Sequence, residues 1–185
     1  MNNIKKLFIY PLAFVLFFGL TANTCLDAVE NLTIDVPTDF VETFEISITE
    51  SGEFSVSKDM DMTSDEVQEY RDKIENYTVE DIKFVVTDNL EGGSALSDNA
   101  VLSFIYANDP LRLIFQNNEN IKTRLEGTTL ADLEGLKQMV EQIVLDRNAD
   151  VADPTIVVEF KGDAQGPIDY TVEVTIFGVL EASAD

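Results

Sequence analysis

Apolar and polar residues alternate along much of this 185-residue chain, and the alternation predicts β-strands. In the segment 40–48 the side chains of Phe44 and Ile46 share one face, and a turn at 51–53 leads into a second alternating segment at 54–60. Two such segments joined by a short turn predict a β-hairpin. Further strands are expected at 79–87, 99–107, 111–116, 156–160 and 168–180.

The longest alternating run, 168–180, follows a turn at 162–167. Together with the strand before that turn, the run predicts a closing hairpin. Both faces of residues 176–180 are apolar. A strand with two apolar faces is expected to lie in the middle of a sheet or to be covered on both sides.

Two helices are expected to interrupt the strands. The first has Thr63 as N-cap and Glu66 three residues later, a capping box, and then one apolar side made of Val67, Tyr70, Ile74 and Tyr77. The second begins at Thr129 as N-cap, with Asp132 three residues later, and its apolar stripe runs up to Arg147. About seven or eight short strands with two peripheral α-helices predict a mostly β fold, a two-layer antiparallel β-sandwich.

The first 24 residues predict a signal peptide. Lys5 and Lys6 precede an apolar run at 7–20, the order of charged and hydrophobic regions in secretory signals. A membrane-spanning helix needs about 18 or more apolar residues, so the run is short for a permanent anchor, and an N-terminal membrane helix is the alternative. Residues 1–24 are therefore expected to be removed on export.

The single cysteine, Cys25, follows the leader directly and is expected to be the lipid-attachment residue. Its surroundings resemble a lipobox, from which Ala22, Asn23 and Thr24 depart; ordinary cleavage nearby is the alternative. A lone unpaired cysteine in an exported protein is otherwise a liability. A lipid of two or three chains holds a protein stably at a membrane, here expected to be the outer membrane, on its periplasmic or its surface side.

The chain behind Cys25 is expected to fold as one unit. Residues 25–36 are either a lipid-anchored tether or the start of the first strand, because Leu32, Ile34 and Val36 alternate with polar residues. Residues 37–185 are long enough for one hydrophobic core and are expected to form a single β-rich domain.

The amino-acid composition argues against several classes of partner and of catalytic chemistry. With 12 basic and 35 acidic residues, the net charge of −23 repels the phosphates of nucleic acids and the anionic headgroups of membranes. The chain has no histidine, which excludes imidazole-dependent triads and the usual zinc and copper sites, and no glycine-rich phosphate loop. We therefore expect no nucleic-acid partner, no cofactor and no catalytic activity.

Three acidic clusters are weak candidates for a calcium site. Asp59, Asp61 and Asp65 resemble the start of an EF-hand loop, but the loop glycine is replaced by Ser64 and the final acid by Tyr70. A strand that runs into a capped helix explains the same residues. The other two clusters read as solvated loops, and they comprise Asp146, Asp150 and Asp153 in one case and residues 88–93 with 98–99 in the other.

The order of segments resembles small β-rich lipoproteins of marine Bacteroidota. The shared layout is a leader and cysteine, an acidic hairpin at 44–60, a capped helix, a strand at 77–87, a second capped helix and a closing hairpin. That group has no assigned activity. The resemblance implies an exported compartment and a β-rich fold, and it supplies no site residues.

Three hypotheses of function follow. The first is an exported, lipid-anchored binding or structural protein without catalytic activity, whose protein or glycan partner the residues do not identify. The second is a calcium-stabilised adhesion or glycan-binding module. The third, ranked last, is a carboxylate-dependent hydrolase, for which the acidic residues offer many pairs and no way to choose among them.

Overall fold

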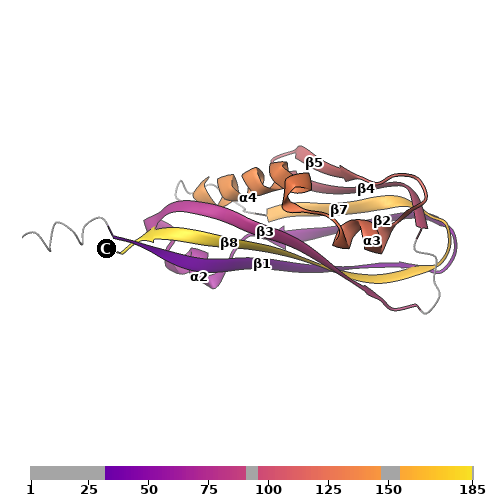
Figure 1. Ribbon diagram of the computed structural model, residues 1–185, viewed down its shortest axis with the longest axis horizontal. Helices are drawn as coiled ribbons and strands as arrows, with labels where there is room; N and C mark the ends of the chain where they lie inside the picture. The colour runs from indigo at the N-terminus through magenta and orange to yellow at the C-terminus, as the bar shows by residue number, and fades with distance from the viewer. Residues whose placement is uncertain (1–31, 91–95, 147–154, 185) are drawn as a thin grey trace, which may run out of the picture.

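The computed structural model describes residues 32–90, 96–146 and 155–184, and it shows two antiparallel sheets packed face to face in an elongated sandwich (Figure 1). The three-stranded sheet has the order β1 (Thr33–Ile48), β8 (Ile168–Ser183) and β3 (Ile74–Asp88). The five-stranded sheet has the order β2 (Gly52–Asp61), β7 (Thr155–Ala164), β4 (Leu96–Tyr106) and β5 (Asp109–Ile114), with β6 (Glu119–Asn120) paired to β4. The predicted two-layer antiparallel β-sandwich is confirmed.

Aromatic side chains from both inner faces form the centre of the core. Phe84 of the three-stranded sheet faces Phe104 of the other sheet, with ring centroids 6.5 Å apart. Within the five-stranded sheet, Phe160 contacts Phe54 at 5.1 Å and Phe115 at 5.3 Å. These tilted and edge-on arrangements are the ones that the charge distribution of aromatic rings favours.

The two predicted hairpins are wrong, although the strands themselves are present. β1 pairs with β8, and β2 pairs with β7, so the turn after Ile48 carries the chain from one sheet to the other. The turn between β7 and β8 does the same. Alternation only shows that a strand has one buried face, and that face is the same whether the next strand lies beside it or opposite it.

β8 is the central strand of its sheet, as the two apolar faces at 176–180 predicted. It pairs with β1 over sixteen residue pairs without a register shift. Its pairing with β3 has an irregularity between Val79 and Asp81. Because a bulge adds one residue, the buried positions of β3 change from odd numbers (Tyr77, Val79) to even numbers (Ile82, Phe84).

The predicted helix from Thr63 to Tyr77 is wrong beyond its first turn. α2 covers only Asp65–Glu69, and its cap is Ser64, whose hydroxyl accepts the N–H of Val67 at 3.1 Å. A 3₁₀ turn follows, and β3 begins at Ile74. Ile74 and Tyr77 fit helical spacing, but they lie in a segment that pairs with β8, and this long-range pairing outweighs local spacing.

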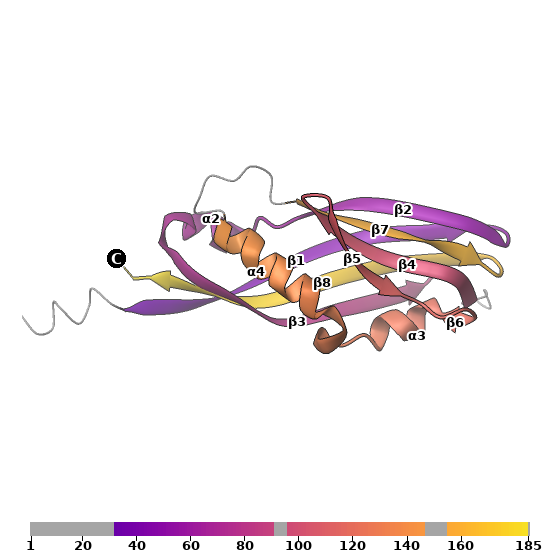
Figure 2. The ribbon, with the colours of Figure 1, turned by 90° about the horizontal axis from the view of Figure 1, so that it is seen from above.

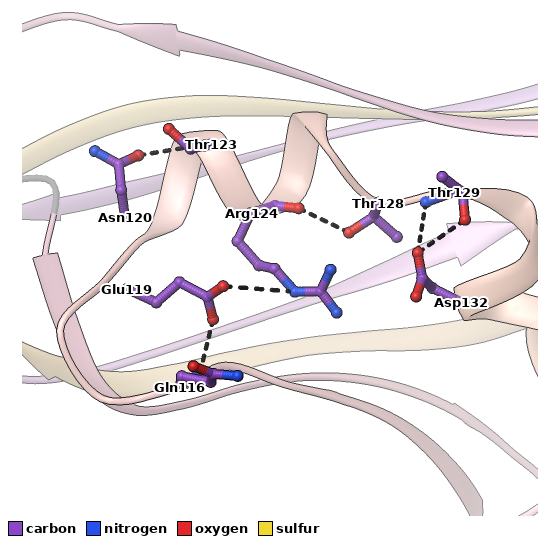
Figure 3. Close-up of polar contacts among 8 residues, drawn as sticks. All are labelled: Gln116, Glu119, Asn120, Thr123, Arg124, Thr128, Thr129 and Asp132. Atoms are coloured by element: carbon purple, nitrogen blue, oxygen red, sulfur yellow. Dashed lines mark hydrogen bonds and ion pairs between the residues drawn. The ribbon is translucent and has the colours of Figure 1, made fainter.

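The second predicted helix is largely confirmed, and a further helix precedes it. A 3₁₀ turn at Leu130–Leu133 leads into α4 (Glu134–Asp146), and one carboxylate oxygen of Asp132 accepts both the N–H and the hydroxyl of Thr129, at 2.9 and 2.8 Å (Figure 3). These bonds hold the pKa of Asp132 below its usual value. α3 (Ile121–Glu126) was not predicted; the side chain of Asn120 caps it.

One long edge of the three-stranded sheet is covered by helices. α3 and α4 lie beside β3 (Figure 2). A carboxylate oxygen of Glu141 in α4 accepts the N–H of Val79 at 3.0 Å, and one of Glu126 in α3 accepts the N–H of Val86 at 3.3 Å. We call β3 the covered edge and β1, at the other side of the same sheet, the open edge.

The N-terminal predictions fall mostly outside the described residues. The signal peptide (1–24) and Cys25 lie there, and so does most of the segment 25–36. The last part of that segment belongs to β1, which begins at Thr33. None of the helices in the described ranges is long and apolar enough to cross a membrane.

Candidate binding groove on the outer face of the five-stranded sheet

Two adjoining hollows lie on the outer face of the five-stranded sheet. Their volumes are about 460 and 480 Å³, and both are lined by Val101 and Lys161. Ligand sites in proteins commonly have volumes of about 300–1,000 Å³, so each hollow is large enough for a small ligand. We call the two hollows together the outer groove.

Strand register arranges the outer-face side chains, in the groove and beside it, in three rows across β2, β7, β4 and β5. The middle row contains only polar and charged residues, whereas the rows on either side also carry apolar residues. The rows are Ser55, Lys161, Val101 and Ile114; then Ser57, Glu159, Ser103 and Arg112; then Asp59, Val157, Ile105 and Pro110.

The two cations that line the groove, Lys161 and Arg112, differ in their ion pairs. The ammonium group of Lys161 lies 2.9 Å from a carboxylate oxygen of Glu159, two residues away on the same strand. The guanidinium group of Arg112 has no ion-pair partner among the residues that the structure describes. In so acidic a protein, an uncompensated arginine beside apolar side chains is available to an anionic group of a ligand.

A β-bulge closes one end of the groove. Between Asp98 and Val101, β4 has one more residue than β7, and Asn99 there takes a left-handed backbone with φ 51°. Its amide group donates to a carboxylate oxygen of Asp163 at 2.9 Å, and its N–H donates to the side chain of Asn117 at 3.1 Å. Bulges often redirect side chains at binding sites, and this one turns Asn99 toward the groove.

Gly162 makes the bulge sterically feasible. A Cβ atom there would lie 2.8 Å from the Cα atom of Ala100 and 3.1 Å from the ring of Phe54. Neither distance leaves room for a side chain. The glycine therefore lets β7 approach the bulged strand closely, as glycines inside strands commonly do.

Further amide and carboxylate groups brace the same end of the molecule. The side-chain amide of Gln165 donates to Asp98 at 3.0 Å and to Asn118 at 2.8 Å, and the other carboxylate oxygen of Asp98 accepts the N–H of Asn118 at 2.8 Å. These bonds tie the β7–β8 turn to β4. They fix the polar end of the groove, so that little ordering is needed when a ligand binds.

The residues that the sequence suggested for calcium are not brought together. Asp59 and Asp61 lie on the outer face of β2, where a carboxylate oxygen of Asp61 accepts the N–H of Thr63 at 2.8 Å, and Asp65 begins α2. Within the described ranges, no group of three or more aspartates, glutamates or cysteines could hold a metal ion.

The two other acidic clusters are placed differently from each other. Asp146 is the last residue of α4 and accepts a hydrogen bond from Gln142 at 2.6 Å, whereas Asp150 and Asp153 lie outside the described residues. The expected strand connection at 98–99 is wrong, because both residues belong to β4 at the bulge. Asn99 was the one sequence feature that could have indicated the bulge, because asparagine adopts a left-handed backbone conformation more readily than most residues.

Perturbed ionisable groups lie away from the groove. Burial and the charges of Glu141 and Asp39 raise the pKa of Tyr77 far above its usual value, and its hydroxyl is buried without a hydrogen-bond partner in the described part of the chain. Burial and the charge of Asp88 raise the pKa of Tyr170. Both tyrosines belong to the core, where they are 2% exposed, so their altered pKa values reflect packing rather than chemistry.

Comparison with known proteins adds no relative: no protein-family model, no curated protein and no solved structure matches this chain. The chemistry of the outer groove is that of a binding surface, with hydroxyl, amide and carboxylate groups, an apolar strip, and the guanidinium of Arg112, which forms no ion pair with any residue in the described ranges.

Proposed function

We propose that this protein is an exported, lipid-anchored binding protein without catalytic activity, and that the outer groove is its ligand site. The leader and Cys25 support export and anchoring. The observation that carries the binding site is the guanidinium of Arg112, which has no ion-pair partner among the described residues and lies in a hollow lined by apolar side chains, Ser103, Glu159 and Lys161. The bound group is therefore expected to be anionic or strongly polar, and small enough to lie across three or four strands.

The position of the groove suits an anchored binding protein. β1 begins eight residues after Cys25, and the C-terminus lies at the same end of the sandwich as that start (Figure 1). The bulged end of the groove lies near the turn between β1 and β2, at the opposite end. A strand of sixteen residues spans roughly 50 Å, so an anchor at Cys25 would hold the groove well away from the membrane.

A second candidate function is glycan binding in the same groove, without calcium. Its support is the polar end of the groove, where Asn99, Asp163 and Lys161 offer the donors and acceptors that sugar hydroxyls require. Arg112 would pair with the carboxylate of an acidic sugar. The groove would then bind an oligosaccharide of uronic acids more tightly than a neutral one.

Isothermal titration of the full chain in a non-ionic detergent, with an oligouronate and a neutral oligosaccharide as probes, tests both candidates. Arg112→Ala should abolish binding of the acidic probe. Lys83→Ala is the matched control, because Lys83 is a surface cation on the outer face of the other sheet. Binding that both variants retain would exclude the groove, and cleavage of either probe would overturn the non-catalytic proposal.

The anchor is tested separately by growing cells with a labelled fatty acid. The unchanged chain should take up label and sediment with membranes, and Cys25→Ala should do neither. Membrane association that persists in the Cys25→Ala chain, together with no label on the unchanged chain, would contradict lipid attachment.

A further inference from the structure

The open edge offers an unusually long and regular template for another strand. β1 pairs with β8 from Thr33 to Ile48 without interruption, and no described strand pairs with its other side. Pro37 has no N–H, and the N–H of Thr43 is bonded to the side chain of Glu42 at 3.0 Å rather than to β8. Odd-numbered residues of β1 therefore direct their backbone groups away from the sheet.

An edge strand with unpaired backbone groups of this kind promotes aggregation of the protein unless the edge is blocked. Two of the other edges of this sandwich are blocked: helices cover β3, and β5 is only six residues long and contains Pro110, whereas β2, at the edge of the five-stranded sheet, has ten residues and pairs only with β7. In the described part of the chain, β1 has two local blocks, Pro37 and the carboxylate of Glu42, and β2 and α2 contact it without pairing with its outer side. The backbone of Asp39, Val41 and Glu45 is left available for pairing.

Carboxylates line the open edge. The outward-facing side chains of β1 include Asp35, Asp39 and Glu45, with the half-exposed Val41 (54%) between them. The neighbouring strand adds Glu173 opposite Thr43 and Glu181 opposite Asp35 on the same face. A strand added here would lie against a strongly negative surface with one apolar position at its centre.

Charge decides which strand fits. A second copy of this chain would bring two rows of carboxylates together, and like charges on adjacent strands destabilise pairing. Lysine or arginine side chains at alternate positions of an incoming strand would instead lie opposite Asp39 and Glu45. Because side chains alternate along a strand, the basic side chains at every second position all lie on the face of Asp39, Val41 and Glu45, and the residues between them lie on the opposite face of the sheet.

We propose that the open edge of β1 binds an extended, cationic segment of a partner protein by strand addition. Main-chain hydrogen bonds to the odd-numbered residues supply the affinity, and the carboxylates select the basic side chains. This binding is separate from the outer groove, which lies on the other sheet. It gives the acidic outer face of the three-stranded sheet a specific role beyond solubility.

Fluorescence anisotropy of the full chain in a non-ionic detergent tests the proposal, with a labelled peptide of alternating lysine and valine as the probe. Val41→Pro should weaken binding by about tenfold or more, because it removes an outward N–H and blocks its neighbours. Val41→Ala keeps that N–H and should bind nearly as well as the unchanged chain. A peptide of alternating glutamate and valine should not bind.

Hydrogen exchange on the unchanged chain keeps the test independent of folding effects. Saturating peptide should slow exchange at the amides of Asp39, Val41 and Glu45, and should leave the amide of Lys83 on the outer face unchanged. Equal peptide affinity of Val41→Pro and the unchanged chain, with no slowing at these amides, would reduce the effect to nonspecific attraction and overturn the proposal. Sedimentation showing a dimer that Val41→Pro dissolves would overturn it in favour of a second copy.

Discussion

The two edges of the three-stranded sheet differ in how their outward backbone groups are protected. At the covered edge, α3 and α4 lie along β3, and the carboxylates of Glu126 and Glu141 accept two of its outward N–H groups. Each of these glutamates also has a lysine one helical turn earlier, Lys122 at 3.8 Å and Lys137 at 4.0 Å. At the open edge, α2 contacts β1, but no helix carboxylate in the described part of the chain accepts one of the outward N–H groups of β1.

The difference shows how an acidic protein can protect a strand edge. Carboxylates on helices are placed to accept backbone N–H groups, and the helices themselves bury apolar area against the sheet. At the open edge, Glu42 of β1 forms an ion pair with Lys58 of β2 at 3.4 Å, which is largely exposed and contributes little. The covered edge therefore supports stability, and the open edge remains available for binding.

The largest effect is expected from loosening α4 on the covered edge. Leu136→Ala removes a fully buried side chain of α4 and should lower the free energy of unfolding by about 2–5 kcal/mol. Urea denaturation measures the change. Ile114→Ala is the control, because that side chain on the outer face is 68% exposed and its loss should cost less than about 0.5 kcal/mol. Equal losses in the two variants would show that α4 adds nothing to the core.

A smaller effect is expected from removing one helix carboxylate. Glu141→Ala leaves the N–H of Val79 without its acceptor and should cost about 1–3 kcal/mol. Glu134→Ala, in the same helix, removes an exposed carboxylate whose hydrogen bond in the described part of the chain is to Gln138, and it should cost less than Glu141→Ala. Hydrogen exchange should quicken at the amide of Val79 in the first variant alone. An unchanged exchange rate there would mean that the covered edge is protected by packing only.

The smallest effect at neutral pH concerns Tyr77, whose phenol lies between the two edges. Its raised pKa means that the unfolded chain ionises first, so stability holds below about pH 10 and falls as the pH rises further. Tyr77→Phe should flatten that fall and, by removing an unpaired buried hydroxyl, stabilise the protein by about 1 kcal/mol. Urea denaturation from pH 7 to 11 measures both, with Tyr170→Phe for comparison. A fall as steep in Tyr77→Phe as in the unchanged chain would assign the alkaline loss to other groups.

Local patterns in the sequence were sufficient for the elements that local forces control. Strands were expected wherever polar and apolar residues alternate, and eight were found in the described ranges. The capping pair Thr129 and Asp132 also behaves as expected. Capping bonds and alternation involve neighbours within a few residues, so the chain alone is enough to predict them.

The candidate site could not be predicted from local sequence patterns. Arg112 and Ser103 become neighbours only through the pairing of β4 with β5, and Glu159 joins them through the pairing of β4 with β7. Asn99 was expected in an acidic loop, whereas a one-residue bulge turns it toward the groove. The residues that line the groove come from separate segments of the chain, so no local sequence motif predicts it.

By itself, the sequence determined a mostly β sandwich, its apolar faces, the capped second helix and the absence of histidine chemistry. The tertiary structure decided which strands pair, that the segment after Glu69 becomes a strand rather than helix, and which edge stays open. The physical reason is that alternation records burial of one face, whereas pairing depends on contacts between distant segments. The pairing of β1 with β8 joins residues more than a hundred positions apart, and only the folded chain brings them together.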